Sequence, residues 1–141
     1  MQVQPYLVFE GRCEEALEFY RKALGAEIEM MMRFKDAPEP PPPGMAPPPA
    51  DKVMHACFRV GDTAILASDG QCAGGGKSQF AGFSLALSAK DDADAKRKFG
   101  ALAEGGQVRM PITSTFFASS FGVVADRFGV SWMVLAGPKQ P

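Results

Sequence analysis

Apolar positions along this chain alternate first as in a strand and then as in a helix, and the same succession occurs a second time. Residues 3–9 are rich in β-branched and aromatic side chains, which predicts a strand. Beyond the turn at residues 10–12, apolar residues recur at i, i+3, i+4, i+7 and i+11, namely Cys13, Ala16, Leu17, Tyr20 and Leu24. This spacing is one face of a helix, and Gly25 is the residue type that closes a helix in the left-handed conformation.

The second occurrence of the pattern begins near residue 81. Residues 83–87 predict a strand, and residues 91–104 predict a helix capped by Asp91 or Asp92. A shift of 80 positions places Phe19 on Phe99. Because an internal repeat decides the fold before any single element does, we predict one domain, residues 1–141, built from modules at about 1–70 and 79–137.

Three further strands follow each predicted helix. They are expected at residues 26–34, 53–60 and 63–68, and again at 107–112, 119–125 and 130–136, with Pro111 stopping the first of the second set. The fold class is therefore α+β, with the order strand, helix, strand, strand, strand given twice.

A proline-rich loop at residues 38–50 interrupts the first module. Residues 38–49 contain eight of the twelve prolines, which excludes a helix or a central strand. We expect an extended, solvent-exposed spacer of polyproline II character. Two other uses stay open, a ligand for an SH3-type partner and a flap over a cavity mouth.

Composition narrows the function classes. The formal net charge of −1 gives no electrostatic basis for binding nucleic acid or an anionic membrane. No run of 18 apolar residues occurs, and Cys13, Cys57 and Cys72 show no CxxC spacing. We expect a soluble, cytoplasmic protein with reduced thiols, no membrane association and no nucleic-acid partner.

The sequence does not support two motifs that are typical of nucleotide-binding proteins. The glycine-rich stretch at residues 73–78 resembles a phosphate-binding loop, but Gln71 stands where that motif needs glycine, and a strand rather than a helix follows. A nucleotide-binding methyltransferase needs a glycine-rich turn after a first parallel strand, and the sequence does not support one.

His55 and the aromatic stretch near residue 116 are the candidates for chemistry. Alternation along residues 53–60 places His55 and Cys57 on one face of a strand, where the histidine either lines a pocket or acts as an acid or base. Phe116 and Phe121 lie among serines and threonines, an arrangement that suits a partly apolar ligand or a hydrophobic plug.

Several segments, taken in order, resemble one known family. They are residues 5–9 (PYLVF), 16–20 (ALEFY), 54–56 (MHA), 66–69 (LASD), 103–106 (AEGG) and 126–133 (DRFGVSWM). Together they resemble the PhnB-like branch of the glyoxalase/bleomycin-resistance superfamily, also called vicinal oxygen chelate. The resemblance covers nearly the whole chain apart from the proline-rich loop.

The resemblance implies two βαβββ modules whose mixed sheets form a barrel-like cup, and usually a homodimer. Metal enzymes of the superfamily carry ligands on the first and fourth strands of each module, which fall near Pro5, Leu66, Phe83 and Met133. These side chains lack the donors that a hard divalent ion needs. We therefore expect no metal and no other cofactor, while Gln4 or His55 would become donors if the register slipped by one residue.

The predicted function is a metal-free protein that binds a small, partly apolar molecule. The alternative is an enzyme of the same superfamily, of the lyase or isomerase, dioxygenase or thiol-transfer type, with His55 as acid or base. The predicted lining combines apolar and aromatic side chains with two polar ones: Pro5, Leu7, Phe9, His55, Leu66, Ser68, Phe83, Leu85, Phe116, Phe121 and Met133.

Overall fold

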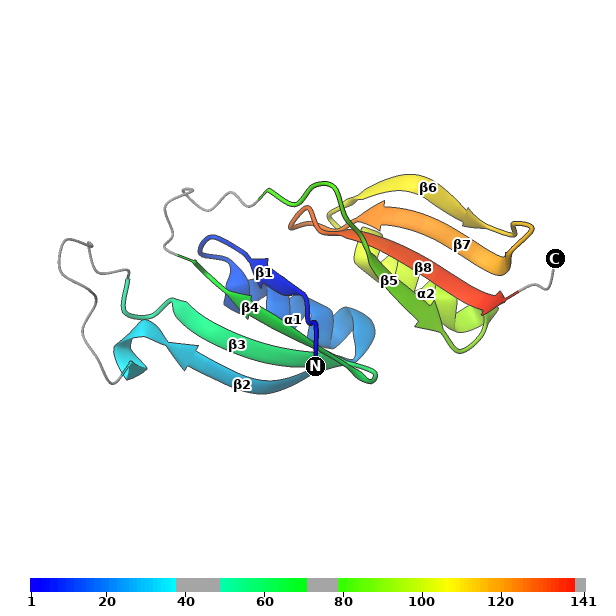
Figure 1. The fold of residues 1–141 in the computed structure, drawn as a ribbon. Helices are drawn as coiled ribbons and strands as arrows, with labels where there is room; N and C mark the ends of the chain where they lie inside the picture. The colour runs from blue at the N-terminus through cyan, green and yellow to red at the C-terminus, as the bar shows by residue number, and fades with distance from the viewer. Residues whose placement is uncertain (38–48, 71–78, 139–141) are drawn as a thin grey trace. The chain divides into compact units, whose positions relative to one another are not determined.

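The structure, a computed structural model, describes residues 1–37, 49–70 and 79–138 (Figure 1). The chain divides into two compact units, Met1–Ser78 and Gln79–Pro141. Most of the proline-rich loop, the glycine-rich stretch and Cys72 lie outside the described residues, so the predictions about them remain predictions.

The first unit contains one helix on a four-stranded sheet. Its elements are β1 (Tyr6–Val8), α1 (Cys13–Leu24), β2 (Glu27–Arg33), the short 3-10 helix η1 (Phe34–Asp36), β3 (Val53–Val60) and β4 (Thr63–Ser68). The strand order is β1-β4-β3-β2, with β1 parallel to β4 and the other pairs antiparallel. The bounds of β3 and β4 are those the sequence predicts, whereas β1 is shorter than residues 3–9.

The second unit repeats this plan. Its elements are β5 (Leu85–Ala89), α2 (Asp92–Ala103), β6 (Gln107–Thr113), β7 (Ala118–Ala125) and β8 (Ser131–Pro138). The strand order β5-β8-β7-β6 again has one parallel pair, β5 with β8. The prediction of an α+β fold with two βαβββ modules is confirmed.

The apolar stripe of α1 forms the core of the first unit. Leu17 and Tyr20 are fully buried, and the ring of Tyr20 stacks on Phe58 of β3 at a centroid distance of 5.6 Å. Gly25 follows the helix with φ of 69°, the left-handed conformation that glycine adopts without steric cost.

The helix of the second unit begins at a side-chain cap. Asp91 accepts a hydrogen bond from the amide of Asp94 at 2.7 Å, which satisfies a donor that the first helical turn leaves open. Phe99 of α2 packs against β7 at Gly122, where an added Cβ would lie 2.7 Å from its ring. Glycine at this position therefore allows the helix to approach the sheet.

The prediction that Pro111 stops a strand is wrong. β6 continues through Pro111 to Thr113. It is the edge strand of its sheet, and its pairing with β7 is irregular between Met110 and Thr113. A strand tolerates proline at a sheet edge or a bulge, because a residue there need not donate a backbone hydrogen bond to a neighbouring strand.

Asp69 ties the first unit together. One carboxylate oxygen accepts the amide of Cys13 at 2.7 Å and the other accepts the amide of Val53 at 2.6 Å. Arg12, the residue before α1, provides no side-chain cap, so Asp69 caps this helix from the end of β4. Burial, with the charges of Asp69 and Glu14 adding to it, raises the pKa of the Cys13 thiol well above its usual range.

Among the helices of the described residues, none is long and apolar enough to cross a membrane.

Candidate functional site

Each sheet has one face toward its own helix and one face away from it. We call the latter the open face. Register pairs Leu66 with both Tyr6 and Cys57, and side chains alternate along each strand, so one set of residues shares the open face of the first sheet. These residues are Tyr6 and Val8 of β1, Met30 and Met32 of β2, His55 and Cys57 of β3, and Leu66 and Ser68 of β4.

Tyr6 and His55 form a polar pair on this open face. The Tyr6 hydroxyl lies 3.4 Å from Nδ1 of His55, and the two ring centroids are 5.8 Å apart. Tyr6 is 47% exposed and His55 is half-buried, so both remain accessible to a ligand. The tyrosine provides a partner that orients the imidazole, and sequence reasoning missed it because the two residues lie 49 positions apart.

The neighbours of this pair are mostly apolar and half-exposed. Leu66 and Met32 are half-buried, and Met30 is 39% exposed. Ser68 is buried, and its hydroxyl accepts the amide of Gly70 at 3.1 Å. The open face therefore offers an adaptable apolar surface with few polar groups, the composition typical of small-molecule sites.

Three residues of the predicted lining lie on the other face of their sheets. Leu7 is 1% exposed and Phe9 is 0% exposed. The ring of Phe9 lies 6.3 Å from Tyr20 of α1. Leu85 pairs with the buried Trp132, which places it on the helix side of the second sheet. The structure thus places Leu7 and Phe9 in the hydrophobic core of the first unit and the half-buried Leu85 on the helix side of its sheet, so none of the three lies on an open face.

The remaining residues of the predicted lining lie on different elements of the two units. Pro5 is half-buried, and its carbonyl accepts the amide of Leu66 at 2.9 Å. Met133 lies on the open face of the second sheet, paired with Val123. Phe83 precedes β5 and is 46% exposed.

The aromatic stretch forms a connected series at the β6–β7 turn. Phe116 contacts Phe117, and Phe117 contacts Phe121, each at a centroid distance of 5.1 Å. Their exposed fractions fall from 81% at Phe116 to 40% and then 9% at Phe121. Thr115 holds the turn by accepting the amide of Ala118 at 3.1 Å. The inner ring closes the core, and the outer ring is presented to solvent.

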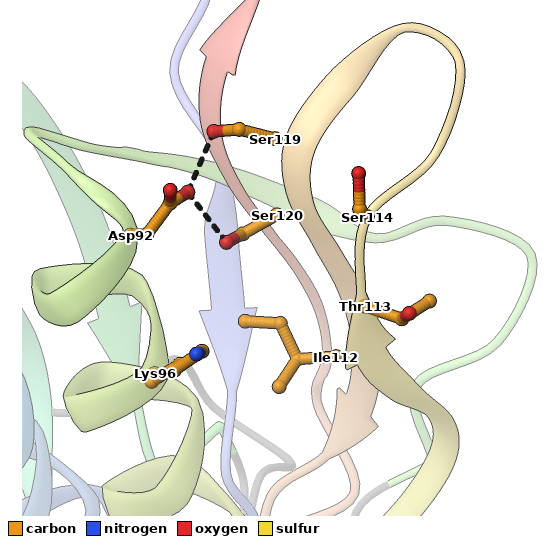
Figure 2. A pocket seen from close by; sticks show the side chains of 7 residues that line it. All are labelled: Asp92, Lys96, Ile112, Thr113, Ser114, Ser119 and Ser120. Carbon is orange, nitrogen blue, oxygen red and sulfur yellow. Dashed lines mark hydrogen bonds between the residues drawn. The ribbon is translucent and has the colours of Figure 1, made fainter.

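A pocket that sequence reasoning missed lies within the second unit (Figure 2). Its volume is about 290 Å³, and it lies between the start of α2, the end of β6 and the start of β7. Most of its lining is polar: Asp92, Lys96, Ile112, Thr113, Ser114, Ser119 and Ser120. No sequence motif predicts this pocket, because its lining residues come from three separate elements.

Comparison with known proteins places this fold in a family. Residues 1–135 match the family described as 3-demethylubiquinone-9 3-methyltransferase. The chain is 36% identical to Protein YjdN of Escherichia coli, over 100% of this chain and 99% of that protein. The chain belongs to this family.

Solved structures support the assignment. Protein PA1353 from Pseudomonas aeruginosa is 43% identical with a TM-score of 0.81, covering 100% of this chain and 99% of that one. A PhnB protein from Bacillus cereus is 26% identical with a TM-score of 0.76, covering 97% and 100%. The family is thus the PhnB-like branch predicted from the sequence.

The wider fold is that of the glyoxalase/bleomycin-resistance superfamily. A glyoxylase/bleomycin resistance protein/dioxygenase domain from Frankia and a fosfomycin resistance protein from Mesorhizobium loti both share it, with TM-scores of 0.60 at 16% and 14% identity. At these identities the likeness concerns the fold alone.

The metal site of the superfamily does not fit the residues of this PhnB-like chain. Pro5, Leu66, Phe83 and Met133 offer no carboxylate, imidazole or amide side chain. Both carboxylate oxygens of Asp69, at the end of β4, already accept backbone amides. Within residues 1–37, 49–70 and 79–138, no three histidine, cysteine, aspartate or glutamate side chains gather as an ion would need.

Proposed function

We propose that the protein binds a small, partly apolar molecule on the open face of the first sheet. The observation that carries this proposal is the Tyr6–His55 pair, with its 3.4 Å contact, set among the half-exposed Leu66, Met30 and Met32. A few convergent polar groups on an apolar surface fix the orientation of a ligand, while the apolar contacts supply most of its affinity. Methionine side chains adapt to the ligand's shape.

An enzyme with His55 as acid or base is the second candidate. The same contact favours it, because an acid or base must be held in a defined orientation, and the Tyr6 hydroxyl stands at Nδ1 of the ring. The methyltransferase activity in the family description finds no support in this fold. A nucleotide-binding methyltransferase needs a mostly parallel sheet, whereas each sheet of the described residues contains one parallel pair of strands.

The test begins with mass spectrometry of molecules that co-purify with the full chain. We expect one compound in stoichiometric amount. Its affinity for the purified protein should fall at least ten-fold in Tyr6→Ala and His55→Ala, and should be unchanged in Thr63→Ala, a control at the exposed β3–β4 turn. Unchanged affinity in both site variants would contradict the proposal.

The two candidates differ in what happens to the bound compound. A binding protein returns it unaltered after prolonged incubation, whereas an enzyme converts it. Conversion that is lost in His55→Ala while binding is retained would replace the binding proposal with the enzyme. Tyr6→Phe then separates positioning from packing, because it removes only the hydroxyl.

We also propose that the protein works without the superfamily's metal ion. The four positions that correspond to the superfamily's metal ligands carry apolar side chains, which supply no donor atoms to replace the hydration shell of an ion. Calorimetric titration with nickel, zinc, manganese and iron(II) is expected to show no stoichiometric binding. One tightly bound ion per chain, lost in Gln4→Ala or His55→Ala, would refute this.

A homodimer in the cytoplasm completes the proposal. In the part of the chain that the structure describes, the outer strands β1 and β2 of the first sheet and β5 and β6 of the second each pair on one side only, and unpaired strand edges are usually covered. Sedimentation at micromolar concentration should show a species of twice the 15.1 kDa chain mass. A monomer throughout that range would contradict the dimer, and recovery of the protein in a membrane fraction would contradict the location.

A further inference from the structure

Four side chains with metal-binding atoms lie together on the open face of the first sheet. The strands β2 and β3 are antiparallel neighbours (Figure 1), and their register pairs Met30 with Cys57 and Met32 with His55. Residues directly opposite each other on such strands have Cβ atoms about 4.5–5.5 Å apart, and alternate residues of one strand share a face. Two thioethers, a thiol and an imidazole are therefore neighbours, and we call these four residues the sulfur–imidazole cluster.

The cluster is accessible from solvent and partly shielded from it. Met32, His55 and Cys57 are half-buried, and Met30 is 39% exposed. Cys57 is a free cysteine, so its sulfur is not used in a disulfide. Leu66 pairs with Cys57 on the side away from β2 and adds an apolar neighbour. An ion can thus reach the sulfur atoms, while the apolar surroundings reduce the competition from water.

His55 has one ring nitrogen in contact and one nitrogen left for a ligand. The Tyr6 hydroxyl lies 3.4 Å from Nδ1, whereas Nε2 has no hydrogen-bond partner among the residues that the structure describes. A metal-binding histidine commonly donates its other ring N–H to an oxygen atom, which fixes the tautomer and directs the unprotonated nitrogen at the ion. The Tyr6 oxygen can accept such a bond.

The second unit shows that the fold does not require a thiol and an imidazole at these positions. Register through β4 and β8 places Val123 of β7 where β3 has Cys57. Two residues earlier, Phe121 stands where β3 has His55. The same positions of the repeated sheet therefore accept ordinary apolar side chains, so packing alone does not account for the donors in the first sheet.

The donor types favour a soft, singly charged ion. Thiolate and thioether ligands select Cu(I), whereas zinc binds cysteine, histidine and carboxylate side chains, and the cluster has only two of these. The Cys57 thiolate neutralises the single charge of Cu(I), while a divalent ion would leave an uncompensated charge on an apolar surface. We propose that the sulfur–imidazole cluster binds one Cu(I) ion. Binding releases the Cys57 thiol proton to solvent and changes no oxidation state.

This Cu(I) site goes beyond the proposed function, although both use the same open face. The ion needs no organic ligand, and the organic ligand needs no sulfur atom. Methionine and leucine have similar volumes, so a Met→Leu change retains the apolar surface and removes only the ability to bind the ion. Such variants separate the two proposals.

The experiment is a competition titration of the full-length, reduced protein under anaerobic conditions. Cu(I), supplied as its acetonitrile complex, is shared between the protein and bicinchoninate, whose copper complex is coloured. We expect one Cu(I) per chain to be held against this chelator. X-ray absorption at the copper edge should then show sulfur neighbours together with an imidazole nitrogen.

Variants test the individual donors. Cys57→Ala should weaken Cu(I) binding at least ten-fold, and Met30→Leu and Met32→Leu should each weaken it at least about three-fold. Met31→Leu is the matched control, because Met31 pairs with the buried Ala56 and so lies on the helix side of the same strand. It should leave the affinity for Cu(I) unchanged, and so should Cys72→Ala, which removes a different thiol from the chain.

The proposal is overturned if the wild-type protein loses all Cu(I) to the chelator, if binding is unchanged in Cys57→Ala, or if Met31→Leu weakens binding as much as Met30→Leu. If Cys57→Ala fails to fold, the leucine variants and the absorption spectrum decide. A protein that binds no Cu(I) but binds its organic compound through Tyr6 would refute this site and leave the proposed function standing.

Discussion

Replacement of Asp69 by alanine is the sharpest test of how the first unit is held together. The side chain is 1% exposed and joins two segments far apart in the sequence, the start of α1 and the start of β3. Its two oxygens accept the amides of Cys13 at 2.7 Å and Val53 at 2.6 Å. Alanine would leave both buried amides without these acceptors.

The expected cost follows from these two bonds. A hydrogen bond to a charged group contributes about 1.5–3 kcal/mol, and a buried donor left unsatisfied carries a desolvation penalty of similar size. Two such bonds give a loss of about 3–6 kcal/mol in the free energy of unfolding. Because domains are stable by only about 5–15 kcal/mol, this loss removes a large part of the stability of the first unit.

Urea denaturation followed by far-UV circular dichroism measures the loss, and amide hydrogen exchange locates it. Exchange at Cys13 and Val53 should accelerate in Asp69→Ala, while Trp132 fluorescence reports the second unit separately. Asp69→Asn should lie between wild type and alanine, since its amide oxygen accepts one backbone N–H and its NH2 group opposes the other. Asp62→Ala, at the exposed β3–β4 turn, is the control and should change stability by less than about 0.5 kcal/mol.

A loss below about 1 kcal/mol in Asp69→Ala, less than a single charged hydrogen bond contributes, would refute the reasoning. An Asp69→Asn variant as stable as the wild type would also refute it, because the second hydrogen bond would then contribute nothing to the free energy of unfolding.

Three further outcomes are expected. Leu17→Ala removes a fully buried side chain of α1 and should cost about 2–5 kcal/mol in urea denaturation, so an unchanged midpoint would show that its burial contributes nothing. The hydrogen bond from Lys98 lowers the pKa of Asp94 in the folded protein. Asp94→Asn should therefore lose its full amount of stability above about pH 4, and the difference from wild type should shrink as the pH falls through the lowered pKa of the folded state. A stability difference that does not change with pH would contradict this. Iodoacetamide at pH 8 should leave Cys13 unmodified in the native protein and alkylate it in urea, because burial raises its pKa, and mass spectrometry of the peptides detects either result.

The local elements of this protein could be predicted from its sequence because they depend on neighbours in the chain. The stripe that includes Leu17 and Tyr20 has helical spacing, and Gly25 marks the end of the helix, so the bounds of α1 follow from residues 13–25 alone. The repeat then predicts the same succession along the chain, strand, helix, strand, strand, strand, in both units. The resemblance added the family, which the comparisons confirm.

The faces of the strands could not be assigned in the same way. Alternation sorts residues 6–9 into two sets, Leu7 with Phe9 and Tyr6 with Val8, but both sets are apolar or aromatic. Only the position of α1 decides that Leu7 and Phe9 are the buried set, which moves the candidate site to Tyr6.

Contacts between distant segments were likewise decided by the tertiary structure. The Tyr6–His55 pair, the cap that Asp69 supplies to α1 and the bond from Ser120 to Asp92 join residues 28–56 positions apart. No local pattern encodes such a pair, since each partner is a common surface or turn residue when viewed alone. Sheet pairing brings them together, because β1 pairs with β4 and β4 with β3 in the first unit, and β5 pairs with β8 and β8 with β7 in the second.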